Sequence, residues 1–258
     1  MRTAIAKTQE EIDSCIKFAS ANPIKNLLLL GNLYPPLSKV SEIYFTKYND
    51  TILGVGIVLN LWDIPAVVVN GVNNDVIYEL LKCSTIPIKN KFFTFCEEDK
   101  VKVFREFGDV REWHKEQQMA LVDKSKLKQS QYAEKITNKD YNGIDEFFST
   151  HEAPAWNPLH LETGPYYVIK RDDKIVSAAG THFLTPSIGQ IGNVTTDKNY
   201  RRQGFASMCC SAVASEIISR TAVVSLFVET ENNAAMWMYK NLGFRKVRDI
   251  PFIMLEKH

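Results

Sequence analysis

The order of predicted secondary structure repeats once along the chain, and this repeat constrains the fold more than any other feature of the sequence. Each half runs helix, two paired strands, a third strand, a helix and a further strand. This order indicates an α/β (α+β) fold, in which each half is a twisted, mixed and mostly antiparallel sheet flanked by helices. Two copies of one unit and two unrelated mixed domains both fit the pattern, and we prefer the tandem copies.

Short-range signals support the repeat. In the first half, Thr8 and Glu11 have capping-box spacing at the start of a helix. Asn49-Asp50 separates two apolar strands and favours a tight hairpin turn. In the second half, Thr137 and Asp140 are expected to cap the first helix, and Asp172-Asp173 separates the next two strands. The remaining elements expected there are strands at 189–196 and 223–229, helices at about 204–219 and 232–242, and one or two strands within 244–255.

The length of 258 residues is comfortable for two domains. We expect a degenerate N-terminal domain at 1–123, a Lys-rich linker at 124–131 and a catalytic domain at 132–258. No segment contains the roughly 20 apolar residues that span a bilayer, and the N-terminus reads as a helix start instead of a signal peptide. Five cysteines without a C-x-x-C pair argue against a disulfide framework or a metal site, so a cytoplasmic protein is expected.

A candidate phosphate-binding loop lies at Arg201-Arg202-Gln203-Gly204-Phe205-Ala206, between an apolar strand and a helix. A helix start gathers free backbone N–H groups and the positive end of the helix dipole, and both attract anions. Gly204 lets the backbone approach a phosphate because it lacks a Cβ atom. The two arginines could contact a pyrophosphate or a 3′-phosphate. The segment lacks the G-K-[ST] of nucleotide P-loops, and an ordinary polar loop also fits it.

A second pattern lies downstream. Asn232, Ala235, Met236 and Tyr239 share one helix face, and Gly243-Phe244 follows as the helix end and the start of a strand. One interpretation makes this face a stripe of core residues with Asn232 as the N-cap. Alternatively, the Tyr239 hydroxyl reaches a cleft and donates a proton to a leaving thiolate.

Together these patterns resemble the GNAT superfamily of N-acyltransferases over about Tyr132 to His258. The resemblance rests on Val194-x-Thr196 before Arg201-x-x-Gly204-x-Ala206, and on Asn232-x-x-Ala235-x-x-x-Tyr239-x-x-x-Gly243-Phe244. It implies a sheet that opens between the strands at 189–196 and 223–229, with the pantetheine arm of an acyl-CoA in the opening. The residues implied to bind the coenzyme are Asn193, Val194, Thr195, Thr196, Arg201, Arg202, Gln203, Gly204, Phe205, Ala206, Ser207, Asn232, Ala235 and Tyr239.

The first half is similar, more faintly, to the N-terminal domain of the glycine N-acyltransferase group. The similarity rests on Leu61-Trp-Asp-Ile-Pro-Ala-Val-Val-Val69. In that group a degenerate GNAT-like half precedes the active one. No R-x-x-G-x-[GA] occurs before residue 130, and the corresponding segment 70–75 contains Gly71 but no arginine. We therefore expect a structural or substrate-facing role for this half, without coenzyme.

Acyl transfer to an amine requires a base, because an alkylammonium has a pKa of about 10.4. It also requires a donor for the oxyanion, for which the Val194 N–H is a candidate, and an acid for the thiolate, for which Tyr239 is a candidate. The resemblance implies a carboxylate on the strand before the phosphate loop, as in several members of the superfamily, and this sequence has Gln190 there. A glutamine can position water but cannot accept a proton at neutral pH. The candidates for the base are therefore Glu152, Glu162, His182 and Glu229, and the segment 151–164 is either a substrate lid or an irregular connection.

The preferred function is that of an acyl-CoA-dependent N-acyltransferase, by default an N-acetyltransferase that uses acetyl-CoA without a metal. Its acceptor would be a primary amine of a small molecule or peptide, and a tandem pair could act as a monomer or homodimer. The alternative is a non-catalytic acyl-CoA sensor, which the missing carboxylate at Gln190 favours. A formal net charge of +1 argues against nucleic-acid and membrane partners.

Overall fold

The computed structural model describes residues 1–151 and 153–258, which form two compact units. The first unit consists of Met1–Gln117 together with Arg248–His258, and the second consists of Gln118–Val247. This division differs from the boundaries expected from the sequence: the segment 124–131 lies within the second unit, and the C-terminal segment belongs to the first. In the described part of the chain, no helix has the length and apolar character needed to cross a membrane.

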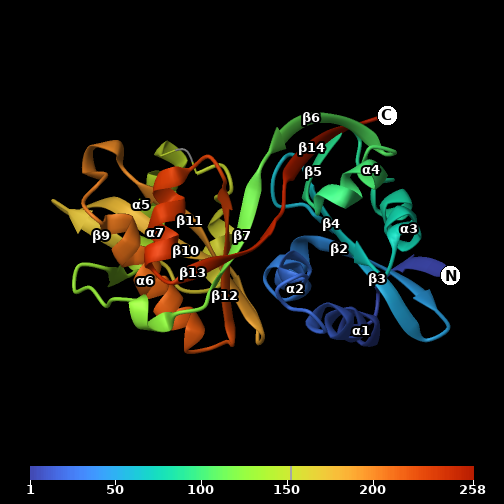
Figure 1. The fold of residues 1–258 in the computed structure, drawn as a ribbon, viewed down its shortest axis with the longest axis horizontal. Helices are drawn as coiled ribbons and strands as arrows, with labels where there is room; N and C mark the ends of the chain where they lie inside the picture. Colours follow the sequence, from blue (N-terminus) through green and yellow to red (C-terminus); the bar gives the residue numbers. More distant parts are fainter. Residues whose placement is uncertain (152) are drawn as a thin grey trace. The chain divides into compact units, whose positions relative to one another are not determined.

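A seven-stranded sheet with the order β1-β2-β3-β4-β5-β14-β6 forms the first unit (Figure 1). Its strands are β1 (Arg2–Ile5), β2 (Ser41–Tyr48), β3 (Thr51–Leu59), β4 (Ala66–Gly71), β5 (Lys91–Phe95), β6 (Gly108–His114) and β14 (Phe252–Lys257). Its helices are α1 (Gln9–Ser20), α2 (Leu27–Leu33), α3 (Asn74–Ser84) and α4 (Val101–Phe104), with 3₁₀ turns η1 (Leu37–Val40) and η2 (Glu98–Lys100).

The helix cap and the hairpin turn that the sequence predicts in the first half are both present in the structure. Thr8 and Glu11 form a capping box at the start of α1. Asn49 has a φ of 51°, the left-handed conformation of a tight hairpin turn between β2 and β3. The core lies between α3 and the sheet, where Val76 and Leu80 of α3 pack with Phe92 of β5.

A second seven-stranded sheet, ordered β13-β7-β12-β11-β10-β9-β8, forms the second unit. Its strands are β7 (Glu116–Leu121), β8 (Glu134–Lys135), β9 (Tyr167–Arg171), β10 (Lys174–Leu184), β11 (Ile188–Thr196), β12 (Val223–Glu229) and β13 (Phe244–Asp249). Its helices are α5 (Tyr141–Thr150), α6 (Phe205–Ile218) and α7 (Asn233–Asn241), with 3₁₀ turns η3 (Lys124–Lys126), η4 (Asn138–Asp140), η5 (Pro158–Glu162) and η6 (Lys198–Tyr200).

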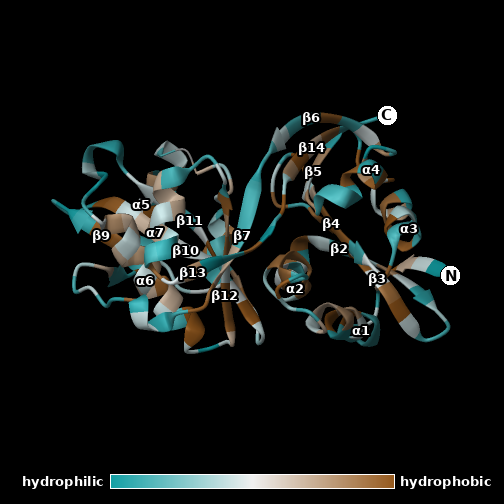
Figure 2. Cartoon of the chain, viewed as in Figure 1, coloured by the Kyte–Doolittle hydropathy of each residue, from teal (hydrophilic) through white to brown (hydrophobic). Residues whose placement is uncertain are grey.

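The second unit repeats the local chemistry of the first. Thr137 and Asp140 form a capping box before α5, and Asp172 and Asp173 both have positive φ in the β9–β10 turn. Buried residues of α6, including Val213 and Ile217, pack against one face of the sheet, while α5 packs on β10. Figure 2 shows apolar residues along the strands of both sheets and polar residues in the connecting loops. The expected α/β fold with two mostly antiparallel sheets is therefore confirmed.

Each sheet contains one strand from a distant part of the chain. In the first unit, β14 pairs antiparallel with both β5 and β6. In the second unit, β7 lies between β12 and β13. The strands within 244–255 were both expected in the second half, and this expectation is wrong for β14. The alternating pattern of a strand predicts that it pairs, but not with which sheet.

Candidate active site

The second sheet opens between its two central parallel strands. β11 and β12 pair in register from Ile188–Val223 to Ile191–Leu226, and the pairing ends there. Among the residues that the structure describes, the rest of β11, from Gly192 to Thr196, pairs with β10 on its other side and not with β12. Backbone N–H and C=O groups on the open side are therefore available to an extended ligand, which could bind as an added strand.

A β-bulge lies where the opening begins. The register of β10 with β11 shifts between Ala178 and Gly180, and Asn193 has a φ of 51°. Asparagine tolerates this left-handed conformation better than most residues. The Asn193 side chain is buried and donates a hydrogen bond of 2.9 Å to the Tyr166 hydroxyl. Because a bulge turns the following groups relative to a regular strand, this one determines the direction of the Val194 N–H.

The predicted phosphate loop leads from β11 through η6 into α6. Arg201, Arg202, Gln203 and Gly204 are all exposed, and Gly204 is the N-cap of α6 with a φ of 80°. The N-cap provides no side-chain hydrogen bond to the first turn of α6. A Cβ atom at Gly204 would meet only Met208, at 3.8 Å, so the space above this residue is open. An exposed helix start without a side-chain cap fits an anionic group.

The other helices of similar position are capped by their own chain. Asn73 accepts a hydrogen bond from the Val76 N–H in α3, and Asn232 accepts one from the Ala235 N–H in α7. Thus Asn232 is an N-cap, as one of the two interpretations of the sequence predicted.

The remaining predicted coenzyme residues divide into backbone and packing positions. Thr196 bonds to Ser177 through their hydroxyl groups at 2.7 Å, and its carbonyl oxygen accepts a hydrogen bond from Arg201 Nε at 3.2 Å. Phe205 is buried in the core of the unit, while Ala206, Ser207, Val194 and Thr195 are half-buried. For most of these residues, the backbone instead of the side chain is suited to contact a ligand.

Tyr239 lies on the inner side of α7. It is 5% exposed and packs edge-on against Phe244, in the same core cluster as Phe205 and Cys210. Burial, with a smaller contribution from Cys210, raises the pKa of Tyr239 well above its ordinary value. The phenol therefore remains protonated, which suits an acid.

His182 belongs to a buried polar cluster on the sheet face opposite α6. Its ring stacks on His160 with centroids 4.8 Å apart, and His160 Nδ1 lies 3.4 Å from Asn193 Nδ2. Desolvation lowers the pKa of both histidines, for His160 to about 2, so both are neutral. Among the described residues, His182 Nε2 has no hydrogen-bond partner although it is buried.

Two glycines make room for this cluster. At Gly192 a Cβ atom would overlap the His182 ring, and at Gly180 it would overlap the Tyr166 ring. Gln190 lies two residues before Gly192 and is 4% exposed, and its Oε1 has no partner among the described residues. A buried polar atom without a partner costs about 1–3 kcal/mol, and among the described residues both His182 Nε2 and Gln190 Oε1 are atoms of this kind.

The carboxylate candidates lie elsewhere. Glu229 is exposed at the end of β12 and Glu162 is exposed in η5. Glu152 lies outside the described residues. Within the segment 151–164, Trp156 donates from Nε1 to Asp145 at 2.8 Å and its ring packs at a tilt against Phe148, so the indole is packed into the unit.

Three members of this candidate site were not among the residues predicted from the sequence. His160 and Tyr166 reach the cluster from η5 and the residue before β9, and no motif marks them. Arg171, at the end of β9, places its guanidinium 4.8 Å from the centre of the Phe205 ring at the start of α6. A possible signal was the pair of glycines at 180 and 192 on neighbouring strands, since a glycine in a strand often marks close packing.

The first unit has a corresponding opening, but its helix start is closed. β4 and β5 pair in parallel at Ala66–Phe93, before the segments that lead to α3 and η2. The Gly71 N–H is bound by Asn70 Oδ1 at 3.0 Å, and Asn73 caps α3. These side chains occupy donors that remain free of side-chain caps at α6.

Comparison with solved structures identifies the class of fold. A Drosophila protein has a TM-score of 0.74 at 13% identity, with 98% of each chain covered. A protein described as a GNAT-family acetyltransferase from Novosphingobium aromaticivorans has a TM-score of 0.64 at 16% identity, covering 86% of this chain and 93% of that one. A tandem GNAT protein from the clavulanic acid biosynthesis pathway has a TM-score of 0.63 at 10% identity, covering 99% and 98%. The chain therefore has the tandem GNAT fold.

A family model agrees with this classification in the second half. Residues 169–253 match the model described as FR47-like protein. These residues include β11, the phosphate loop, α6 and α7. A search of curated proteins by sequence found no match. The fold and the family match are consistent with a GNAT superfamily protein, as the sequence motifs predicted.

Proposed function

We propose that this protein transfers an acyl group from acyl-CoA, by default acetyl-CoA, to the primary amine of a small molecule or peptide. One observation carries the proposal: the open edge of β11 leads directly into an exposed helix start without a side-chain cap. The first feature suits a pantetheine arm and the second suits a pyrophosphate. The bound coenzyme would supply the acyl thioester.

The chain's own groups divide the binding between them. The backbone from Asn193 to Thr196 would pair with the pantetheine arm, and the N–H groups at 204–207 would bind the pyrophosphate. Arg201 and Arg202 are exposed beside the loop and would add positive charge. The Val194 N–H, which follows the bulge, would donate to the oxygen that gains negative charge during transfer.

Among the candidates for the base, we assign proton acceptance from the amine to His182. It is neutral, it lies beside the buried Asn193, and its ring covers Gly192 at the start of the opening. Gln190 on the same face would orient the amine or a water, since it cannot accept the proton itself. Tyr239, which remains protonated, would donate to the departing thiolate.

The cellular site proposed is a reducing cytoplasm. All five cysteines are free thiols, and burial raises the pKa of Cys15, Cys96 and Cys209 to about 12. Thiols of this kind resist oxidation and bind metals poorly because the thiolate is the reactive form.

The test combines coenzyme binding with turnover. CoA binding is measured by calorimetry, and thiol release from acetyl-CoA is measured with a panel of primary amines. Gly204→Glu would place a carboxylate in the open space and should abolish CoA binding, whereas Gly204→Ala has the same left-handed strain without a charge or a capping oxygen and serves as the control. Unchanged CoA affinity in Gly204→Glu would refute the loop assignment.

The turnover arm separates an enzyme from a sensor. His182→Gln should reduce kcat by about 10²-fold or more and leave CoA affinity unchanged. Tight CoA binding by the wild-type protein, with no thiol release on any amine, would instead support the non-catalytic sensor.

A further inference from the structure

Arg171 brings a further cation to the start of α6. It is the last residue of β9, a strand on which α6 packs. Its guanidinium carbon lies 4.8 Å from the centre of the Phe205 ring and 5.7 Å from the centre of the Tyr132 ring. Because Phe205 is the first residue of α6, directly after the N-cap Gly204, this guanidinium lies close to the helix start that has no side-chain cap.

The guanidinium of Arg171 is held in one orientation. Nη1 donates to the Lys170 carbonyl oxygen at 2.9 Å, and both rings lie within the distance at which aromatic groups attract a cation. Among the described residues, no hydrogen bond uses Nε or Nη2. These two groups form one edge of the planar guanidinium, the edge that donates two parallel hydrogen bonds to a phosphate or a carboxylate.

Arg171 also lacks a counter-ion in the described part of the chain. The preceding residue differs, because Lys170 Nζ lies 2.7 Å from Asp140 Oδ1. Asp172 and Asp173 follow Arg171 in the exposed hairpin turn, and neither of these two residues forms an ion pair with it. A half-buried cation without a counter-ion favours an anion from outside the chain, since partial burial removes some of the water that solvates it.

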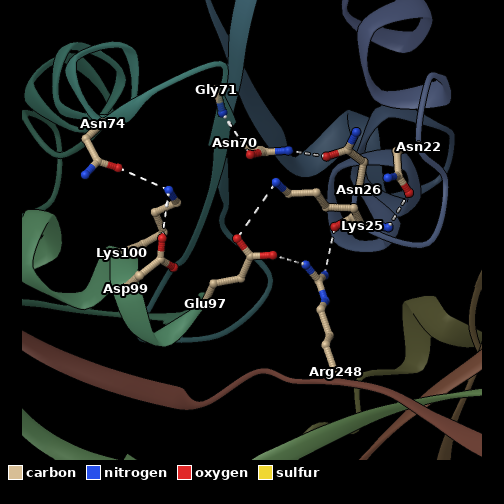
Figure 3. Close-up of polar contacts among 10 residues, drawn as sticks. All are labelled: Asn22, Lys25, Asn26, Asn70, Gly71, Asn74, Glu97, Asp99, Lys100 and Arg248. Atoms are coloured by element: carbon tan, nitrogen blue, oxygen red, sulfur yellow. Dashed lines mark hydrogen bonds and ion pairs between the residues drawn. The ribbon is translucent and has the colours of Figure 1, made fainter.

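The first unit has a different arrangement around its own sheet opening. Figure 3 shows that the cations lining the space between β4 and the segment after β5 have carboxylates of the chain as partners. Glu97 lies 2.8 Å from Arg248 and 3.8 Å from Lys25, and Asp99 lies 3.1 Å from Lys100. Each of these cations therefore has a carboxylate within ion-pair distance, whereas Arg171 has none among the described residues.

The coenzyme of the proposed function carries an anion that the phosphate loop does not account for. In the proposed complex, the N–H groups at 204–207 would bind the pyrophosphate, with Arg201 and Arg202 beside them. Coenzyme A has one further anionic group, the 3′-phosphate on its ribose. A phosphomonoester of this kind has a charge of about −1.5 to −2 at neutral pH and several acceptor oxygens, which suits the free edge of a guanidinium.

We propose that Arg171 binds the 3′-phosphate of the coenzyme through Nε and Nη2, and thereby makes this protein select CoA over dephospho-CoA. This inference rests on the proposed function, since it requires that the second unit binds CoA. It places the selection outside the motif at 201–206, on a separate strand of the sheet. The rings of Phe205 and Tyr132 keep the guanidinium in position for the phosphate.

The test is the ratio of two dissociation constants, for dephospho-CoA and for CoA, measured by calorimetry on the 258-residue chain. The wild-type chain should bind CoA about tenfold more tightly, as expected for one charge-assisted contact. Arg171→Met retains an apolar side chain against Phe205 but removes the guanidinium. In this variant the ratio should fall to about one, with the affinity for dephospho-CoA unchanged.

Two further variants complete the test. Arg171→Lys keeps the positive charge and loses the planar fork, so it should keep only part of the ratio. Arg245→Met is the matched control, because Arg245 also donates from Nη1 to the carbonyl oxygen of the preceding residue, at 2.8 Å. Arg245 belongs to β13, the edge strand on the other side of the sheet from β9, and its loss should leave the ratio at the wild-type value.

A ratio near one in the wild-type chain, or a wild-type ratio in Arg171→Met, would overturn the inference. Equal weakening of CoA and dephospho-CoA in Arg171→Met would also overturn it, because Arg171 would then contact the pyrophosphate or only stabilise the start of α6. Should Arg171→Met fail to fold, the ratio in Arg171→Lys decides, and an unchanged ratio there refutes the role of the fork. All of these results leave CoA binding by the wild-type chain intact. Absence of binding of both ligands to the wild-type chain would instead refute the proposed function and this inference together.

Discussion

A single methyl group at Gly192 should disturb the candidate active site. A Cβ atom built there would have three atoms of the His182 ring within 2.5 Å, whereas carbon atoms in contact prefer about 3.5–4.0 Å. The ring must therefore move by about 1 Å, and its stacking on His160 restricts that movement. Overpacking of this kind costs about 1–3 kcal/mol.

The assay is a double-mutant cycle in urea. The free energy of unfolding is measured for the wild-type chain, Gly192→Ala, His182→Ala and the double variant. Removal of the ring abolishes the overlap, so the two changes should be coupled by about 1–3 kcal/mol, and the double variant should be more stable than the sum predicts. Gly143→Ala is the control, because a Cβ atom at this position would have its nearest neighbour at 3.8 Å. The substitution replaces a glycine within α5, where alanine favours the helix.

Activity provides a second readout of the same displacement. If His182 accepts the proton, Gly192→Ala should lose activity as well as stability, since a base displaced by about 1 Å no longer reaches the amine. Additive free energies within about 0.5 kcal/mol, or a Gly192→Ala variant with wild-type kcat, would refute the reasoning.

Three further predictions concern the second unit. Gly243→Ala should destabilise the chain by more than the roughly 1–2 kcal/mol that a non-glycine residue costs in the left-handed conformation. The reason is that φ is 94° and the new Cβ atom would also overlap the Asp123 carbonyl group. Thermal unfolding measures the loss, and an unchanged Tm would contradict it. Burial lowers the pKa of His160 to about 2, so its contribution to stability is present above the unfolded pKa of about 6.5 and is lost as the pH falls below that value. Between pH 7 and pH 5, the free energy of unfolding of the wild-type chain should therefore fall by about 2 kcal/mol more than that of His160→Gln. Equal losses, measured by urea unfolding, would contradict the burial of a neutral ring. Tyr239→Phe should lower kcat by about 10- to 100-fold with CoA affinity retained, whereas an unchanged kcat would return Tyr239 to a packing role.

The sequence was most informative where one short segment determines the structure. The capping boxes at Thr8 and Thr137 and the hairpin turns at Asn49 and Asp172 form as predicted, because each depends on a few neighbouring residues. Longer-range features were not visible. The charged segment 97–107, for example, contains only η2 and the four-residue α4, a length at which helix formation depends on tertiary packing.

The candidate site divides in the same way. The start of α6 near Gly204 was predictable because the residues that mark it are contiguous, while phosphate binding at this loop stays a prediction. The polar cluster was only partly predictable: His182 was a candidate, but its partners His160 and Tyr166 come from separate segments that only the folded chain brings together. The bulge at Asn193 also escaped prediction, because the register of two strands creates it and no composition marks it.

The position of β14 has a consequence for how this chain is synthesised. In the first sheet, residues 252–257 pair between β5 and β6. When only the first half of the chain has been synthesised, this sheet therefore lacks one of its inner strands. The edges of β5 and β6 remain unpaired until β14 has been synthesised, and unpaired strand edges are prone to aggregation. The order of translation therefore cannot be the order of folding here: the first half to leave the ribosome is among the last parts to be completed.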